Sequence, residues 1–248
     1  MAGKNQLYRK RIVNHLYFSR MLSCAEISER IEKSLSLTTK ILNELVEEGY
    51  VIETGHAPSS GGRRPQMYSL KPDMMYTVSV AVDQFATRLV VMDMQNRYIG
   101  KMESIELNLA GSPGALGIIA DKINGIIDKS GIPKSKIAGI GISMPGFIDA
   151  KEGMNYSFPG NGQGAITSFI ESKTGVPVFI DNDSSLIALA ELKFGAALKK
   201  KNVMVINVGW GIGLGLILNN VLFRGDNGFA GEFSHIPLFQ NGKLFTCG

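Results

Sequence analysis

Val178-Phe-Ile-Asp-Asn-Asp-Ser-Ser-Leu-Ile-Ala-Leu-Ala-Glu191 joins a predicted strand to a predicted helix. The apolar run over residues 176–180, bounded by a glycine and containing a proline, predicts a buried strand. Three polar residues end it, and Asp183 stands where the N-cap of the following amphipathic helix is expected. A strand that ends in carboxylates at a helix start is where α/β proteins place ligand chemistry. Capping alone explains the same residues equally well, so this segment leaves both interpretations open.

Composition narrows the class of protein. The chain has 248 residues, enough for one large domain or two smaller ones, and is 44% hydrophobic and 19% charged, as globular proteins are. It contains no run of about 18 apolar residues and no N-terminal signal, so no membrane partner is expected. Cys24 and Cys247 are too few for a disulfide framework. A reducing cytoplasm fits that cysteine content.

The positive charge is concentrated at the N-terminal end. The net charge is +4, and residues 1–72 hold 11 Lys and Arg against 7 acidic residues, whereas the remainder is balanced at 15 against 15. A basic segment joined to a neutral one indicates an anionic partner for the first segment only. Nucleic acid is the leading candidate for that partner.

Residues 1–72 predict three helices followed by a hairpin. The apolar positions of the first helix are Leu7, Ile12, Val13 and Leu16. A second helix covers residues 25–31, and Ser34 is the expected N-cap of a third helix, which Gly49 ends. Two helices joined by a short turn match the helix-turn-helix pattern, in which the second of the two enters the major groove of DNA.

Polar side chains suited to base edges and phosphates lie on the outward face of the third helix: Ser36, Thr39, Lys40 and Asn43. The helix alone favours a plainer interpretation, a solvated surface. Two predicted strands, over residues 50–54 and 66–70, flank a glycine-rich loop. This loop makes DNA contact the better interpretation. Arg63 and Arg64 in this loop have the chemistry to lie along a narrow minor groove. We therefore expect residues 1–72 to be a winged helix that binds double-stranded DNA.

Residues 73–248 predict an α/β domain. The expected order is three consecutive strands, a helix, a strand that ends in Met144-Pro-Gly146, a second helix, the strand and helix quoted above, and a hairpin. The expected strands are residues 76–83, 88–93, 98–107, 137–143, 203–208 and 215–218, and the expected helices residues 113–129 and 166–173.

Three motifs in this order resemble those of the ROK family (repressors, open reading frames and kinases). Gly141-Ile-Ser-Met-Pro-Gly146 is similar to the family's GxxxPG strand end, Asp181-Asn-Asp-Ser-Ser to its (E/D)NDAN segment, and Gly228-Phe-Ala-Gly-Glu-Phe-Ser-His235 to its GxAGExGH box. Ser59-Ser-Gly-Gly-Arg-Arg-Pro65 resembles the winged helix of ROK repressors. The resemblance implies an actin-like ATPase fold of the sugar-kinase type.

The same resemblance implies roles for individual residues. Asn182 and Glu232 would hydrogen-bond sugar hydroxyls, Gly146 would belong to the sugar site, and His235 would contact the sugar. Asp183 would be the base that takes a proton from the hydroxyl in a kinase, and it could cap the helix as well. Carboxylates, an amide and an imidazole suit a hydroxyl, which both donates and accepts hydrogen bonds.

The two phosphate-binding turns of ROK kinases are degenerate here. The first reads Asp83-Gln-Phe-Ala-Thr87, with side chains where a phosphate needs bare backbone. The second reads Gly209-Trp-Gly-Ile-Gly213, in which Gly209, Gly211 and Gly213 persist but Trp210 replaces a small hydroxyl residue. We therefore expect ATP not to be a cofactor and kinase activity to be lost.

The family's zinc site is also altered. It uses the histidine of the box and a CxCGxxGC run, whereas this chain ends Asn241-Gly-Lys-Leu-Phe-Thr-Cys-Gly248. His235 and Cys247 are remnant ligands, and two ligands do not close a tetrahedral zinc site. We expect the chain to be a fragment with an incomplete second lobe, so that zinc would be held, if at all, by the longer protein.

The sequence leaves three hypotheses. The first is a cytoplasmic, dimeric repressor whose inactive ROK domain senses a sugar and changes affinity for an operator. The second is an ATP-dependent hexose or amino-sugar kinase that carries a DNA-binding module, which Asp183 favours and Trp210 opposes. The third is a DNA-binding protein whose second domain is only a dimerisation scaffold.

Overall fold

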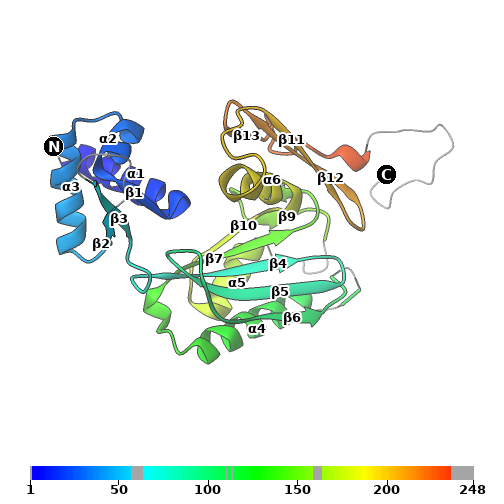
Figure 1. Ribbon diagram of the computed structural model, residues 1–248. Helices are drawn as coiled ribbons and strands as arrows, with labels where there is room; N and C mark the ends of the chain where they lie inside the picture. The colour runs from blue at the N-terminus through cyan, green and yellow to red at the C-terminus, as the bar shows by residue number, and fades with distance from the viewer. Residues whose placement is uncertain (1, 57–63, 110, 113, 159–163, 236–248) are drawn as a thin grey trace. The chain divides into compact units, whose positions relative to one another are not determined.

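The computed structural model describes residues 2–56, 64–109, 111–112, 114–158 and 164–235 (Figure 1). The chain forms two compact units. The first unit comprises Met1–Thr77 together with Met92–Ile99, and the second comprises Val78–Val91 together with Gly100–Gly248. The sequence placed a boundary between residues 72 and 73, so the return of residues 92–99 to the first unit is a feature that it did not indicate.

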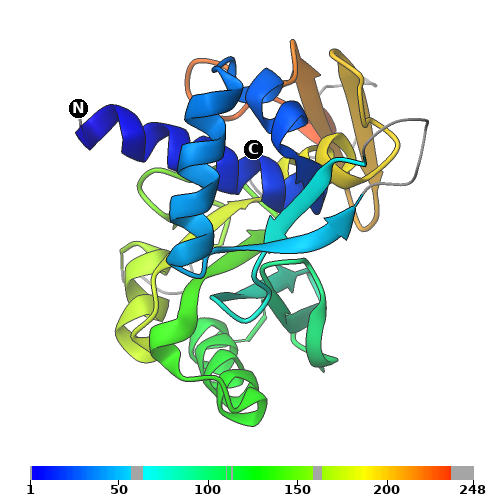
Figure 2. The ribbon, with the colours of Figure 1, turned by 60° about the vertical axis from the view of Figure 1, so that its left-hand side comes forward.

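Three helices build the core of the first unit: α1 (Ala2–Ser19), α2 (Cys24–Ile31) and α3 (Leu35–Glu47). Figure 2 shows α3 running across α1, and the helices bury Ile12, Leu16, Ile27, Ile31, Ile41, Leu42 and Leu45 between them. The predicted N-cap of α3 is confirmed, because the Ser34 side chain accepts a hydrogen bond from the Leu37 amide. The prediction for Leu7 is wrong: its side chain is 55% exposed and is not part of this core.

A small antiparallel sheet completes the winged helix. Its strands lie in the order β1 (Met21–Ser23), β3 (Gln66–Leu70), β2 (Val51–His56), so β2 and β3 confirm the two predicted wing strands. The sequence did not indicate β1, whose three residues are too few to show a period. Buried Leu22, Val51 and Leu70 join the helical core and attach the wing to it.

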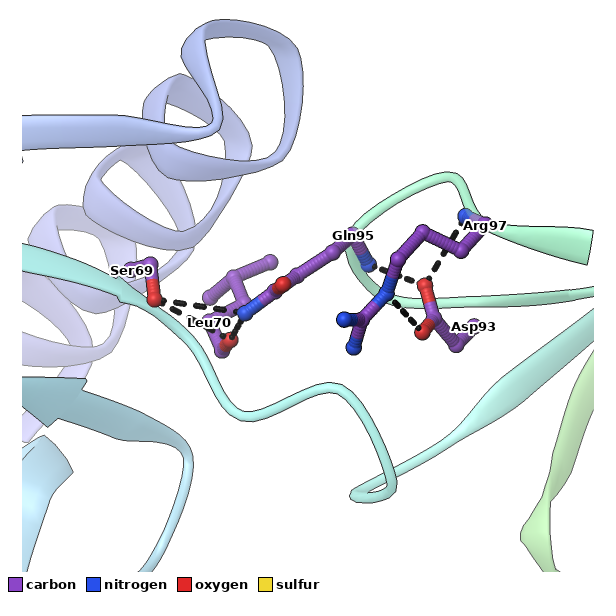
Figure 3. Close-up of polar contacts among 5 residues, drawn as sticks. All are labelled: Ser69, Leu70, Asp93, Gln95 and Arg97. Carbon is purple, nitrogen blue, oxygen red and sulfur yellow. Dashed lines mark hydrogen bonds and ion pairs between the residues drawn. The ribbon is translucent and has the colours of Figure 1, made fainter. Parts of the chain in front are cut away.

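The turn between β5 (Ala86–Asp93) and β6 (Tyr98–Glu106) packs within the first unit (Figure 3). Asp93 is buried and accepts hydrogen bonds from the Gln95 amide, the Arg97 amide and the Arg97 guanidinium. This fixes the turn, and Gln95 Nε2 donates to Ser69 Oγ at 3.3 Å and to the Leu70 carbonyl at 2.8 Å. Asn96 Nδ2 donates to the Tyr17 carbonyl at 3.3 Å. Residues 92–99 are thus hydrogen-bonded both to the wing and to α1.

The second unit is built on a five-stranded sheet in the order β10-β7-β4-β5-β6. The strands not yet bounded are β4 (Tyr76–Val82), β7 (Ile137–Met144) and β10 (Val178–Asn182). β10 pairs with β7 in parallel, with Asn182 opposite Met144, so the two strands end at the same edge. The quoted strand therefore exists, two residues later than the apolar run suggested. Parallel pairing places its carboxyl end beside Pro145 and Gly146.

Helices cover both faces of this sheet, as in layered α/β folds. α4 (Ala115–Ser130) and α5 (Ile166–Thr174) pack together on one face, and α6 (Asp183–Phe194) lies on the other (Figure 1). The buried stripe of α4 contains Leu116, Ile119, Ile123, Ile126 and Ile127, which confirms the predicted apolar face of this helix.

A second sheet, β11 (Val203–Val208), β12 (Ile212–Leu218) and β13 (Val221–Phe223), packs on the other side of α6. The approach between α6 and β12 is very close. A Cβ atom on Gly213 would lie 1.9 Å from Ser184 Oγ, so only glycine fits there. Gly213 therefore has a packing role as well as its place in the degenerate phosphate turn.

Four short elements complete the described fold: β8 (Ile148–Asp149) and β9 (Met154–Asn155), which pair as a ribbon, and the single turns η1 (Lys134–Lys136) and η2 (Phe233–His235). No helix in the described residues is both long and apolar enough to cross a membrane.

Candidate functional site

A cavity of about 470 Å³ in the second unit collects most of the residues predicted for the sugar site and the phosphate turns. Gly146, Asn182, Asp183 and Glu232 all line it, although they come from three separate motifs. Asp83, Gly209, Gly211 and Gly213 of the degenerate turns line it as well. The backbone of His235 lies in η2, and its side chain lies outside the described residues.

Asn182 and Asp183 are placed by the junction of β10 with α6. The N-cap of α6 is Asn182, whose Oδ1 accepts from the Ser185 amide at 3.1 Å, so the predicted cap at Asp183 is wrong by one residue. Asp183 is instead the first helical residue, where the helix dipole favours a negative charge. Its Oδ1 accepts hydrogen bonds from the Ser184 amide and hydroxyl. The carboxylate is thereby held in the cavity wall and remains half-buried.

The strand end at Gly146 is tied to the same junction. Asn182 Nδ2 donates to the Gly146 carbonyl at 3.1 Å. Gly146 has φ +106°, and a Cβ there would lie 2.8 Å from Ser157 Cβ. Both the left-handed backbone and the lack of space require glycine. The predicted association of the GxxxPG motif with Asn182 thus has a direct structural basis.

Sequence reasoning missed two side chains that hold this site together. Asn207, on β11, donates to Asp183 Oδ2 at 3.5 Å and to Ser184 Oγ at 3.3 Å. Arg224, just after β13, makes a bidentate ion pair with Asp181, with contacts of 2.9 and 2.5 Å. The hydrogen bond to Asp181 raises the pKa of Arg224, so the guanidinium stays charged. No sequence motif identifies either residue, since an isolated Asn or Arg gives no periodic sequence pattern.

The two degenerate turns meet at the cavity. Trp210 lines the cavity, and its ring lies edge-on to Phe85 with centroids 4.6 Å apart and an interplanar angle of 65°. Thr87, by contrast, is fully buried and does not line the cavity. The first turn therefore places Asp83 at the cavity and Thr87 inside the protein.

The charge of the cavity is negative. Asp83, Asp183 and Glu232 contribute three carboxylates, and Arg88 contributes a single guanidinium. A phosphate would be repelled by this excess of carboxylates, whereas a neutral polyhydroxylated molecule could hydrogen-bond to them.

The first unit presents the predicted polar face of α3. Ser36, Thr39, Lys40 and Asn43 are all exposed, while Thr38, Ile41, Leu42 and Leu45 of the same helix are buried. Arg64 is exposed at the base of β3, and Arg63 lies outside the described residues. The sequence correctly assigned the two faces of α3.

The predicted zinc remnant is only partly described. Cys247 and the His235 side chain lie outside the described residues. Within the described ranges, no group of three or more His, Cys, Asp or Glu side chains is arranged to hold a metal ion.

Comparison with protein families and relatives agrees with this architecture. The model of the ROK family matches residues 114–248. A xylose repressor from Bacillus spizizenii is 32% identical over 243 residues, which cover 97% of this chain and 62% of the relative. A glucokinase from Halalkalibacterium halodurans is 35% identical over 133 residues, which cover 52% of this chain and 40% of the relative. The chain thus spans about 62% of the length of that repressor.

Solved structures resemble the chain in the same way. A ROK family transcriptional regulator, described as a homologue of the E. coli MLC protein, matches with a TM-score of 0.75 at 22% identity and covers 98% of this chain and 62% of its own. A ROK family glucokinase from Streptomyces griseus in complex with glucose and AMPPNP matches with a TM-score of 0.56 at 27% identity, over 67% of this chain and 52% of its own. The match to the regulator covers nearly the whole chain, whereas the match to the glucokinase covers about two thirds of it. Its motifs, its fold and these relatives establish that the chain belongs to the ROK family.

Proposed function

We propose that this protein is a sugar-responsive, DNA-binding transcriptional regulator, and specifically a repressor. The observation that carries the proposal is the convergence of Asn182, Asp183 and Glu232 on one cavity of a chain that also contains a winged helix. The likeness to xylose repressors over nearly the whole chain supports it. We place the protein in the cytoplasm, where its DNA would be.

The mechanism that we propose is thermodynamic linkage. A sugar held by Asn182, Asp183 and Glu232 would stabilise one conformation of the second unit, and that conformation would have a different affinity for the operator. His235 would be a further sugar contact. Helix-turn-helix repressors read two half-sites as symmetric dimers, so we expect a homodimer in which two α3 helices face successive major grooves.

A thermal-shift screen tests the sugar site. The panel contains D-xylose, D-glucose and N-acetyl-D-mannosamine, each also as its phosphate. A ligand at about 100 times its dissociation constant adds roughly 2.7 kcal/mol to the free energy of unfolding. We expect a shift with a neutral sugar, lost in Asp183→Ala and kept in Asp128→Ala, an exposed change on α4. If the folded protein shifts with none of these sugars, the sensor role is wrong and a scaffold becomes the better account.

DNA binding is tested by selecting bound duplexes from a random pool and then measuring affinity with and without the sugar. Arg64→Ala should weaken binding to all duplexes and lower the salt dependence by about one unit of slope, because it removes a phosphate or groove contact. Asn43→Ala should change the selected sequence itself. Lys122→Ala, an exposed lysine on α4, is the matched control. A winged helix with no role in DNA binding would leave all three variants equal.

Kinase activity is the second candidate, favoured by Asp183 in the cavity and by the ROK glucokinases that the chain resembles. The negative charge of the cavity and the presence of Trp210 argue against kinase activity, because the phosphates of ATP would have to lie beside the carboxylates and beside the indole ring. Sugar-dependent release of ADP that Asp183→Asn abolishes would establish this activity instead of a purely sensory role.

A further inference from the structure

Trp210 is a large aromatic side chain that is exposed at the cavity of the second unit. It is the only tryptophan of the chain and lies in the Gly209–Gly211 turn between β11 and β12. The side chain is 73% exposed and lines the cavity of the second unit. Aromatic rings that remain in water at a cavity are typical of ligand contacts, since binding then removes apolar surface from water.

The position of this ring is fixed by its own hairpin. Val208 pairs with Ile212 in register, and the Gly209 amide donates to the Gly211 carbonyl at 3.0 Å across the turn. One pair below the turn of the same hairpin, Asn207 donates to Asp183 and Ser184. Trp210 is therefore held on the element that also orients the Asp183 carboxylate.

Phe85 fixes the ring from the other sheet. It belongs to the turn between β4 and β5, which is closed by a hydrogen bond from the Asp83 amide to the Ala86 carbonyl at 2.7 Å. The Phe85 carbonyl also accepts from the Leu107 amide at 2.9 Å, so the backbone beneath the ring is held on both sides. Phe85 contacts Trp210 edge-on but does not itself line the cavity. Its role is to position the indole.

Polar side chains line another part of the cavity. Asn182, Asp183 and Glu232 offer an amide and two carboxylates. A sugar ring has hydroxyls around its edge and C–H bonds on its faces. The hydroxyls match the polar walls, and the weakly positive C–H hydrogens match the negative face of an indole.

We propose that Trp210 is a stacking platform for the face of a sugar ring, positioned by Phe85. The proposal rests on the sugar-sensing function and adds a specificity-determining residue to it. An aromatic ring could also stack on a nucleotide base, but the phosphates would then meet the carboxylates of Asp83, Asp183 and Glu232. A neutral sugar is therefore the favoured ligand, and Mg·ATP is the competing probe.

Tryptophan fluorescence tests the platform directly, because all tryptophan emission of this chain comes from residue 210. The unaltered protein is titrated with each sugar of the panel above and with Mg·ATP. We expect a neutral sugar to shift the emission to shorter wavelength and Mg·ATP to leave it unchanged. A shift with Mg·ATP alone would overturn the proposal and support nucleotide binding at this ring.

Variants separate the platform from a merely structural ring. By calorimetry, Trp210→Ala should weaken sugar binding roughly twofold to twelvefold, and Trp210→Phe should weaken it less, since one aromatic contact contributes about 0.5 to 1.5 kcal/mol. Phe85→Ala should weaken sugar binding and shift the emission wavelength of the ligand-free protein. Phe85→Tyr should keep both the affinity and the wavelength of the unaltered protein. The matched control is Phe179→Ala, an aromatic residue on β10 that is 67% exposed and does not line the cavity.

The outcomes distinguish this inference from the function on which it rests. If the unaltered protein and Trp210→Ala bind a sugar equally well, the platform is wrong and the sugar sensor stands. If Trp210→Ala only lowers the melting temperature and leaves the dissociation constant unchanged, the ring is structural and the platform is again wrong. If the unaltered protein binds no sugar by either method, the sensor function and the platform fail together.

Discussion

The hydroxyl of Thr87 is a buried polar group without a hydrogen-bond partner in the described part of the chain. Thr87→Val removes that hydroxyl and keeps the shape of the side chain. We expect the free energy of unfolding to rise by about 1 kcal/mol, because an unsatisfied buried group no longer has to leave water. Chemical denaturation measures the change.

Thr174 is the matched control for this substitution. It is buried to the same extent, but its hydroxyl donates to the Ile170 carbonyl at 2.9 Å. Thr174→Val should therefore lower the free energy of unfolding. Equal effects at the two positions would show that the hydroxyl of Thr87 does have a partner, for example a water molecule.

At the scale of single residues, the sequence predicts which residues form the site but not which hydrogen bonds each of them makes. Asp183 and Asn182 are equally good N-caps by residue type, so no pattern decides between them. The structure decides because Asn182 also reaches the Gly146 carbonyl, a contact between segments 36 residues apart in sequence. The sequence did not indicate the roles of Asn207 and Arg224, for the same reason. Their partners are fixed by the tertiary fold and not by local spacing.

At the scale of elements, α2 begins with a capping box. The Ser23 side chain accepts from the Glu26 amide, and the Glu26 carboxylate accepts from the Ser23 amide at 2.7 Å. Hydrogen bonds from the Ser23 backbone and then from its side chain lower the pKa of Glu26 below its ordinary value of 4.5. A lowered carboxylate pKa stabilises the folded state above the unfolded-state pKa, and this contribution disappears as the pH falls through the folded-state pKa.

The prediction is that Glu26→Gln weakens α2 at neutral pH and that the difference from the unaltered protein disappears in acid. Amide hydrogen exchange within α2 measures the stability of this helix locally, without assuming that the two units unfold together. Glu29→Gln, exposed on the same helix, is the control. A difference that persists unchanged into acid would mean that the charge of Glu26 is not what the cap uses.

The turn between β5 and β6 gives a second prediction at this scale. Asp93→Ala removes the acceptor for the Gln95 amide, the Arg97 amide and the Arg97 guanidinium. A hydrogen bond to a charged group contributes about 1.5 to 3 kcal/mol, so we expect faster amide exchange in residues 92–99 and in β3, to which Gln95 is bonded. Asp121→Ala, exposed on α4, should leave exchange unchanged. Unchanged exchange in Asp93→Ala would mean that the turn does not support the winged helix.

Long elements with a clear period could be read from the sequence, and short ones could not. The buried stripes of α3 and α4 were predicted because they repeat over several turns. β1, β8, β9 and β13 have two or three residues each, and only their partner strands define them. The apolar run at residues 176–180 predicted the right strand with its start two residues early, because Pro177 has no N–H group to donate to the ladder.

At the scale of the whole molecule, one face of the β11–β12–β13 sheet is apolar and exposed. Val203 and Val205 pack towards α6, whereas the alternate residues Met204, Ile206 and Val208 are exposed. Exposed apolar strands of this kind promote association between chains. The double variant Ile206→Thr with Val208→Thr should therefore reduce concentration-dependent association, measured by light scattering, with little change in melting temperature.

Val205→Thr is the matched control, since it faces α6 on the same strand. It should lower the melting temperature and leave association driven by the outer face unchanged. Association that is the same in the double variant and in the unaltered protein would show that this face does not contact other chains.

The place of residues 92–99 in the first unit has a consequence for how this winged-helix unit could be exchanged in evolution or by engineering. A gene fusion that joins residues 1–72 to a foreign sensor would leave behind the turn that is bonded to Tyr17, Ser69 and Leu70. A transplant that preserves the first unit has to include the β5–β6 turn, and the strands that this turn joins belong to the five-stranded sheet of the second unit. New combinations of a winged helix with a second unit are therefore easiest between ROK chains that have an equivalent turn.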